Sequence, residues 1–399
     1  MKLLELAMSE LKGELLQGDM GVELGALVYD SRKISPGCLF VCMKGANFDS
    51  HELLPELPGK GVAAVVIDRE VETLPEGLTV YRADNARAAL AALSAAYFGF
   101  PARELLTVGV TGTKGKTTTT HMIRALLEAG GIPTGLIGTN GITIGKEHIA
   151  TKNTTPESYE IQESFRKMAD AGCKAVVMEV SSQGLMLHRT GSILFDYGVF
   201  MNIAPDHIGP NEHKSFEEYL FWKSQLFLQC KTGLINADDV HSLYIEKMAT
   251  CEKLYRFGEK NPADFTLRNL SHTADPDFVG MRFDFAGAGR EVADVKVGMP
   301  GRFNAENALA ALSGVKDEVL RTGLKNIRVN GRMEIVKLHP YTVLVDYAHN
   351  AVSMEALLDA LREYHPKRLV VVFGCGGNRA KERRTSMGEI GGKKADLSI

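Results

Sequence analysis

The sequence predicts an α/β protein made of two or three domains. Its 399 residues are too many for one ordinary core, since a domain averages about 150 residues. A hydrophobic content of 45%, a charged content of 24% and 40 glycines are typical of a globular chain. From residue 102 onward, short apolar runs alternate with amphipathic helical segments, which is the pattern of a parallel sheet flanked by helices.

This pattern centres on a glycine-rich turn, GVTGTKGKTTTT, at residues 109–120. A predicted strand over 105–110 precedes the turn and a predicted helix over 117–129 follows it. Glycines let the backbone point its N–H groups at an anion by the positive end of a helix, where phosphate is stabilised. The strict P-loop pattern is not met, because Val110 stands where its first glycine belongs, and an ordinary glycine-rich loop is the alternative. The predicted nucleotide site comprises Gly112, Thr113, Lys114, Gly115, Lys116, Thr117 and Thr118.

Charge, hydropathy and cysteine usage argue against several classes of protein. A net charge of −3 and a pI of about 6.4 argue against a general nucleic-acid binder, which carries a basic surface. No run reaches the ~18 apolar residues of a membrane span and the first residues are too charged for a secretory signal, so we expect no membrane insertion and a cytoplasmic location. The six cysteines lack CxxC spacing, which favours reduced thiols over a zinc site or disulfides.

Residues 1–100 form the first predicted domain, which has strand and helix patterns but no phosphate loop of its own. An alanine-rich helix over 86–97 ends near Gly99, where we place a linker. Ser31 lies in an Asp-Ser-Arg turn, which is either part of a binding site or an ordinary turn with a solvated ion pair.

Polar residues follow the predicted strands of the central part, residues 101–330, at the edge where parallel sheets bind ligands. Glu179 ends one apolar run and is either a magnesium ligand or one half of a salt bridge. His207 comes after the next predicted strand and would by itself be a hydrogen-bonded loop histidine. Lys223 flanks the apolar stripe of a predicted helix over 216–227, and by itself it would be a surface residue.

Two further features lie toward the C-terminus. Asn304 and Asn307 are one helical turn apart and could present two amides to one ligand, or else Asn304 caps the helix and Asn307 faces solvent. Beyond residue 330 a new set of patterns begins, with the polar segment DYAHN after a predicted strand. Only about two strand-helix units follow in residues 331–399, so we expect the chain to stop inside a third domain.

Seven motifs in this order resemble those of the Mur ligase family. They are GTKGKTTT, MEVSSQGL, DH followed by YLFWK, GRFNAENALAA, GRME, DYAHN and FGCGGNR, and the resemblance runs from Asp30 to the last residue. It implies a UDP-binding domain at 1–100, a central P-loop ATPase domain with a parallel sheet at 101–330, and an incomplete Rossmann-like, amino-acid-binding domain at 331–399. The loop with which the family selects its amino acid falls past this chain's last residue, so we expect the sequence to leave that choice open.

The resemblance implies an ATP-dependent, monomeric ligase of peptidoglycan synthesis. Such a ligase would phosphorylate the D-Glu carboxylate of UDP-MurNAc-L-Ala-D-Glu and then join a free amino acid, diaminopimelate or lysine, to the acyl phosphate. The alternatives are a related ligase with a folylpolyglutamate-like or cyanophycin-like acceptor, and a nucleotide-binding chain without ligase activity. Gln183 and the loop 208–213 depart from the usual family residues, which leaves the fit of the substrate there open.

The resemblance also assigns roles to residues. It implies that Lys223 is carbamylated by CO₂ and joins Glu179 and His207 around a second magnesium ion, with Thr117 near the first. Lys116 would neutralise charge on the phosphoryl oxygens. The residues expected around ATP are Asn304 and Asn307 at adenine, with Arg332, Asp346 and His349 where the third domain closes. Those expected at the other substrates are Ser31, Asn153, Thr154, Thr155, Ser181 and Arg189 for the UDP-sugar-peptide, and Arg384 for the amino acid.

Overall fold

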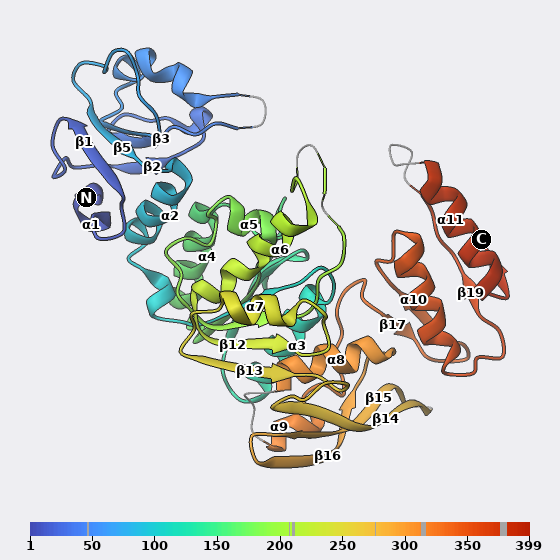
Figure 1. Ribbon diagram of the computed structural model, residues 1–399. Helices are drawn as coiled ribbons and strands as arrows, with labels where there is room; N and C mark the ends of the chain where they lie inside the picture. Colours follow the sequence, from blue (N-terminus) through green and yellow to red (C-terminus); the bar gives the residue numbers. More distant parts are fainter. Residues whose placement is uncertain (46–47, 207, 210–211, 276, 313–316, 376–380) are drawn as a thin grey trace.

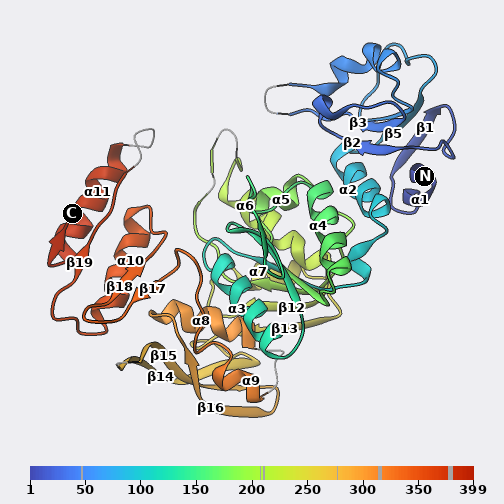
Figure 2. The same cartoon turned by 180° about the vertical axis from the view of Figure 1, so that it is seen from behind.

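The computed structural model describes residues 1–399 except 46–47, 207, 210–211, 276, 313–316 and 376–380. Figures 1 and 2 show three successive parts, an N-terminal part in blue, a central part in green and yellow, and a C-terminal part in red. None of the helices in these described ranges combines the length and the apolar character that crossing a membrane requires.

The N-terminal part is built from α1 (Leu3–Ala7), β1 (Gly13–Gln17), β2 (Ala26–Val28), β3 (Cys38–Val41), β4 (Ala64–Ile67), β5 (Thr79–Ala83) and α2 (Ala86–Tyr97). Its five-stranded sheet has the order β1-β5-β4-β3-β2, in which β1 is the antiparallel edge strand. The sheet is buried on both faces, because Leu39 and Val41 of β3 pack with α1 and α2 while Cys38 and Phe40 pack with the 3₁₀ segment Ser50–Glu56.

The central part begins with elements that surround the glycine-rich turn: β6 (Leu106–Thr111), α3 (Lys116–Ala129), β7 (Thr134–Gly138), β8 (Gly141–Ile144), β9 (Glu147–Ile149), α4 (Ser158–Asp170), β10 (Ala175–Glu179), α5 (Ser182–Met186) and β11 (Phe195–Phe200). It continues with α6 (Phe216–Ser224), β12 (Cys230–Asn236), α7 (Ser242–Met248), β13 (Lys253–Phe257), β14 (Phe265–Asp275), β15 (Phe278–Gly287), β16 (Arg290–Val297), α8 (Arg302–Leu312) and α9 (Asp317–Thr322).

One eleven-stranded sheet runs through the central part in the order β16-β15-β14-β13-β12-β11-β6-β10-β7-β8-β9. The sheet is parallel from β14 to β7, and antiparallel strands extend it at both ends. The predicted α/β class is therefore confirmed, and the expected parallel sheet forms the middle of a larger mixed one. Strand β6, which lies between β11 and β10 in the parallel section, delivers the glycine-rich turn to the carboxyl edge of the sheet.

Helices cover both faces of this sheet. On one face, Val108 and Val110 of β6 pack into an apolar cluster with residues of α3, α8 and α9. On the other face, Ile137 of β7 and Met178 of β10 pack with residues of α4, α5, α6 and α7. Burial on both faces explains why these strands read as continuous apolar runs.

The C-terminal part is built from β17 (Glu334–Lys337), β18 (Val343–Val345), α10 (Ala351–Arg362), β19 (Val370–Val371), α11 (Lys381–Lys394) and β20 (Leu397–Ser398). The strands form two small pairs, β17 with β18 and β19 with β20, rather than one sheet. The Tyr364 hydroxyl donates to the Gly280 carbonyl oxygen at 2.9 Å, and His272 pairs with Glu363, so the end of α10 is fastened to the β14–β15 hairpin of the central part.

Candidate active site

The glycine-rich turn forms a tight bend between β6 and α3. The strand predicted over 105–110 is β6 and the helix predicted over 117–129 is α3, so the expected strand-turn-helix unit is present. Gly115 has φ +85°, and a Cβ atom there would lie 2.5 Å from Asn307 Oδ1. Both the left-handed backbone and the close approach of α8 therefore require glycine at this position.

Two lysine amines meet at one carbonyl oxygen inside the bend. Lys116 Nζ donates to the Gly112 carbonyl at 2.7 Å and to that of Thr113 at 3.2 Å. Lys223 Nζ donates to the same Gly112 carbonyl at 2.9 Å. The bend thus brings together two amines that are far apart in the sequence.

Lys223 is buried, with 1% of its surface exposed, so the prediction from the helix pattern alone that it is a surface residue is wrong. It comes from α6, whose N-terminus is capped by Ser215, and its amine lies 4.5 Å from the centre of the Tyr219 ring. The predicted helix also ends sooner, at Ser224, and continues as the 3₁₀ segment Gln225–Leu228.

Burial and mutual repulsion determine the protonation of these amines. Burial lowers the pKa of Lys223 well below its ordinary value, and the positive charge of Lys116 adds to the effect, while Asp206 opposes it. Burial also lowers the pKa of Lys116, against the nearby negative charge of Glu179. Burial therefore favours the neutral amine of Lys223 over the ammonium ion that an exposed lysine carries.

Glu179 lies beside the bend because β10 pairs with β6. Its carboxylate is buried, with 1% of the residue exposed, and accepts two hydrogen bonds from Thr139 at the end of β7. Among the described residues the Glu179 oxygens contact Thr139 and form no ion pair, so no salt bridge accounts for this carboxylate there. Thr139 did not stand out in the sequence, although it follows the short apolar stretch that forms β7, which is the signal that could have found it.

The oxygen atoms at this edge are of the chemical types that bind magnesium. Glu179 and the Thr117 hydroxyl both line the same cavity, and carboxylate and hydroxyl oxygens are ligands that magnesium accepts. A carboxylate that accepts two hydrogen bonds keeps lone pairs for a cation. The predicted ligand His207 lies outside the described residues. Within the described ranges no group of three or more His, Cys, Asp or Glu side chains is placed like a metal site.

A cavity of about 550 Å³ opens at this edge and gathers most of the predicted site. Three stretches wall it: the bend itself, helix α8, and residues 332–357 of the C-terminal part. The predicted residues that line it are Thr113, Lys114, Gly115, Lys116, Thr117, Thr118, Thr154, Glu179, Asn304, Asn307, Arg332, Asp346 and His349. Asp206, which was not among the predicted site residues, also lines the cavity, 3.8 Å from the Lys114 amine.

The two asparagines on α8 are buried and bonded to each other. Asn307 Nδ2 donates to Asn304 Oδ1 at 3.2 Å, and Asn304 Nδ2 donates to the Pro300 carbonyl at 2.6 Å. Helix α8 begins at Arg302, so the alternative that Asn304 is its N-cap and Asn307 a surface residue is wrong.

The opposite wall is held by the segment after β18. Asp346 accepts hydrogen bonds from the backbone N–H groups of Met333 and Ala348, both at 2.8 Å. The Arg332 guanidinium lies 4.5 Å from the centre of the Tyr347 ring. These contacts order the wall, while Arg332 and His349 remain at the cavity surface.

The other described residues of the predicted site, Gly112 and Lys223 among them, lie outside the lining of this cavity. Thr155 and Ser181 are close to its floor, because the Thr155 hydroxyl donates to the Glu179 carbonyl at 2.9 Å and accepts from the Ser181 N–H at 3.0 Å. Arg189 donates to the Thr155 carbonyl at 3.0 Å. Exposed Asn153 is in the same loop, and exposed Arg384 is on α11 of the C-terminal part.

Ser31 belongs to the N-terminal part, at the carboxyl end of β2. Its neighbours Asp30 and Arg32 form an exposed ion pair at 2.7 Å. This is the geometry expected for an ordinary turn with a solvated ion pair. Tyr29, two residues before Ser31, donates its hydroxyl to Glu160 of α4 and so fastens the N-terminal part to the central one.

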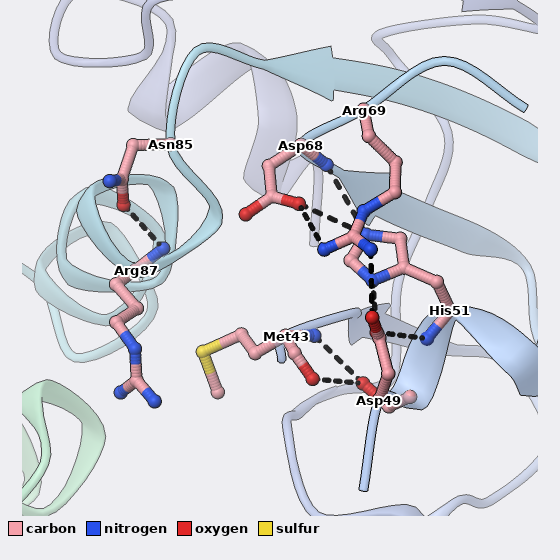
Figure 3. A network of polar contacts seen from close by, with 8 residues as sticks. Met43, Asp49, His51, Asp68, Arg69, Asn85 and Arg87 are labelled. Carbon is pink, nitrogen blue, oxygen red and sulfur yellow. Dashed lines mark hydrogen bonds and ion pairs between the residues drawn. The ribbon is translucent and has the colours of Figure 1, made fainter. Parts of the chain in front are cut away.

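A polar network orders the same edge of the N-terminal sheet. Figure 3 shows Asp49 between His51 and Arg69, with contacts of 2.7 Å to each. The other His51 nitrogen lies 3.2 Å from Asp68. The loop after β3 and the end of β4 are thereby held together.

Comparison with known proteins agrees with these features. Residues 23–98 match the description "Mur ligase family, catalytic domain", residues 110–315 match "Mur ligase middle domain", and residues 331–399 match "Mur ligase, glutamate ligase domain". The chain is 38% identical to UDP-N-acetylmuramoyl-L-alanyl-D-glutamate--2,6-diaminopimelate ligase 1 of Clostridium acetobutylicum, over 98% of this chain and 81% of that one.

Solved structures share the fold. A structure of UDP-N-acetylmuramoyl-L-alanyl-D-glutamate--2,6-diaminopimelate ligase superposes with a TM-score of 0.79 at 23% identity, over 96% of this chain and 79% of that one. MurF ligase from Thermotoga maritima in complex with ADP gives a TM-score of 0.60 at 18% identity, over 96% and 90% of the two chains. With these matches across its whole length, the chain belongs to the Mur ligase family.

Proposed function

We propose that this chain is an ATP-dependent carboxylate–amine ligase of peptidoglycan synthesis. Its substrates would be UDP-MurNAc-L-Ala-D-Glu and diaminopimelate, as the names of its relatives suggest, with lysine as the other candidate amino acid. The proposal includes the division into a UDP-binding domain at 1–100, an ATPase domain at 101–330 and an amino-acid-binding domain at 331–399, and a cytoplasmic monomer.

The observation that carries the proposal is the meeting of Lys116, Lys223 and Glu179 at the glycine-rich bend. A bend at a helix N-terminus with a buried lysine suits the β- and γ-phosphates of a nucleotide. A buried carboxylate, Glu179, and a buried amine of lowered pKa, Lys223, on either side of the same bend suit a metal-assisted transfer of the terminal phosphoryl group. Together they favour an enzyme over a module that only binds nucleotide.

The reaction proceeds in two steps. An oxygen of the D-Glu carboxylate attacks the γ-phosphorus of ATP in line, an O–P bond forms, and ADP leaves. The amine of the incoming amino acid then attacks the acyl carbon, a C–N bond forms, phosphate leaves with the C–O electron pair, and the nitrogen loses a proton. Lys116 and the backbone N–H groups of the bend neutralise charge on the phosphoryl oxygens during the first step.

We propose that two magnesium ions accompany ATP, the first near Thr117 and the second held by Glu179, His207 and a carbamate on Lys223. When bound, magnesium would supply positive charge that stabilises the negative charge on the phosphoryl oxygens. Lys223 suits the carbamate because a neutral amine can attack CO₂ at its carbon and release a proton, whereas an ammonium ion cannot. The carbamate would exchange the amine for two oxygen ligands.

The other residues receive proposed roles by position. Asn304 and Asn307 would lie near the adenine, and Arg332, Asp346 and His349 where the C-terminal part closes over ATP. Asn153, Thr154, Thr155, Ser181 and Arg189 suit the sugar-peptide, since they surround the floor beneath Glu179. Ser31 would bind the UDP portion and Arg384 the amino acid.

The proposal is tested by phosphate release. Purified protein is given Mg-ATP, bicarbonate, UDP-MurNAc-L-Ala-D-Glu and diaminopimelate together, and then with each omitted in turn. Release should require every component, and Lys116→Met should abolish it while Lys146→Met, in an exposed turn away from the cavity, should not. Release that does not depend on the dipeptide would refute the assigned substrate.

Two alternatives are separated by binding measurements. A folate-type acceptor predicts no thermal stabilisation by saturating UDP, whereas a UDP-binding domain predicts an increase of several degrees. A chain that only binds nucleotide predicts stabilisation by both UDP and ADP with no phosphate release under any combination. Turnover with lysine but not with diaminopimelate would change only the assigned amino acid.

A further inference from the structure

Thr139 holds the carboxylate of Glu179 from the neighbouring strand. Its backbone N–H donates to Glu179 Oε1 at 2.8 Å and its hydroxyl donates to Oε2 at 3.2 Å. Thr139 therefore contacts both carboxylate oxygens through two different groups, which fixes both the position and the rotation of the carboxylate. Among the described residues these are the hydrogen bonds that the carboxylate accepts.

The backbone before Thr139 is shaped around the same carboxylate. A Cβ atom on Gly138 would lie 2.3 Å from Glu179 Oε1, so a side chain at this position would displace the carboxylate. Thr139 and Gly138 together wrap the buried end of Glu179 at the tip of β7. The hydrogen-bonded pairing of β7 with β10 holds these residues beside Glu179.

The hydroxyl of Thr139 also has a second partner, Thr154, at 3.0 Å between the two Oγ1 atoms. A hydroxyl has one proton, and an ionised carboxylate can only accept. Thr139 must therefore donate to Glu179 and accept from Thr154. The two hydrogen bonds form a chain in which Thr154 donates to Thr139 and Thr139 donates to Glu179. The chain links the loop proposed to bind the sugar-peptide to the carboxylate proposed to bind a cation.

We propose that Thr139 is a positioning residue that orients Glu179 for the divalent cation and couples this carboxylate to Thr154. The inference rests on the proposed function, because it takes Glu179 as a metal ligand. Groups that hold a ligand from behind commonly change metal affinity by 10- to 100-fold when they are removed. Thr139→Val removes the hydroxyl but retains the shape of the side chain and the backbone donor. The expected loss of metal affinity is therefore at the lower end of this range, about tenfold.

The test measures cation binding directly. Mn²⁺ replaces Mg²⁺ as the probe and is titrated into the full chain with saturating ADP, and free Mn²⁺ is followed by electron paramagnetic resonance. Thr139→Val should raise the Mn²⁺ dissociation constant about tenfold, and Thr139→Ser, which restores the hydroxyl, should return it to within about threefold of the original. Thr143→Val, on the adjacent strand β8 but outside the cavity lining, is the matched control and should leave the constant unchanged.

A Glu179→Gln variant separates this inference from the proposed function. If Glu179→Gln weakens Mn²⁺ binding and Thr139→Val does not, the role of Thr139 is refuted while Glu179 remains a ligand. If neither variant weakens binding, the metal role of Glu179 fails and the inference fails with it. Equal losses in Thr139→Val and Thr139→Ser would also refute it, because the hydroxyl would then not be the group that matters.

Discussion

The buried amine of Lys223 predicts an unusual dependence of stability on pH. In the folded protein burial lowers its pKa well below the ordinary value, whereas in the unfolded chain the amine has the ordinary value of 10.5. Between the two pKa values the unfolded chain binds one more proton than the folded protein. Lys223 therefore destabilises the fold in this range, and the cost shrinks as the pH rises toward 10.5.

Replacing Lys223 by Met removes the titrating group and keeps a long apolar side chain in the same space. The free energy of unfolding of Lys223→Met minus that of the original protein should fall as the pH rises. The expected slope is about 1.4 kcal/mol per pH unit, or about 2 kcal/mol between pH 8 and pH 9.5. Urea unfolding at each pH measures this difference. The buffer is free of CO₂, because carbamate formation would change the charge of Lys223. Trp222, the single tryptophan, lies next to Lys223 and reports local unfolding by its fluorescence.

Lys231→Met provides the control. Lys231 is half exposed and pairs with Asp196 at 2.8 Å, and this hydrogen bond raises its pKa. Stability from a raised lysine pKa is fully present below the unfolded value, so the difference caused by Lys231→Met should stay flat between about pH 8 and 9.5. A flat difference for Lys223→Met as well would refute the neutral amine, and with it the physical basis for carbamylation.

Three further substitutions have defined outcomes. Gly115→Ala should cost about 1–2 kcal/mol in urea unfolding, because φ is +85°, and it should weaken ADP binding at least tenfold by calorimetry; unchanged ADP binding would contradict the proposed phosphate site. Tyr29→Phe removes the bond to Glu160 and should cost about 1 kcal/mol, so an unchanged melting temperature would show that this contact contributes nothing. Arg332→Ala should lower kcat/KM for ATP about 100-fold with the same unfolding midpoint, and a proportionate loss of stability would instead indicate a structural role.

Local patterns were enough to predict the bend and its neighbours. The glycines mark the turn, the flanking periodicities mark β6 and α3, and the parallel topology predicts that Glu179 comes to the same edge. These features depend on residues close together in the chain or on a general rule of sheet topology. The alternation of strands and helices likewise predicted the α/β class, though it did not reveal the antiparallel strands at both ends of the sheet.

The burial of Lys223 could not be predicted from its own helix. Its partner, the Gly112 carbonyl, is 111 residues away in the sequence, and periodicity carries no information about such a contact. Thr139 was not predicted as a site residue for the same reason, because its role depends on a contact with Glu179, which is 40 residues away on an adjacent strand. The resemblance to a family pointed to Lys223 but not to Thr139, because a family motif names ligands more readily than the groups that hold them.

The cavity has walls from two different parts of the chain, and this affects how the protein responds when a molecule fills the cavity. Residues 332–357 belong to the C-terminal part, whereas the bend and α8 belong to the central one. A molecule that contacts both walls adds favourable interactions between the two parts and so opposes their separation while it is bound. Protease cleavage near residue 330 should therefore slow when the cavity is filled, so that occupancy can be read from the persistence of the intact chain.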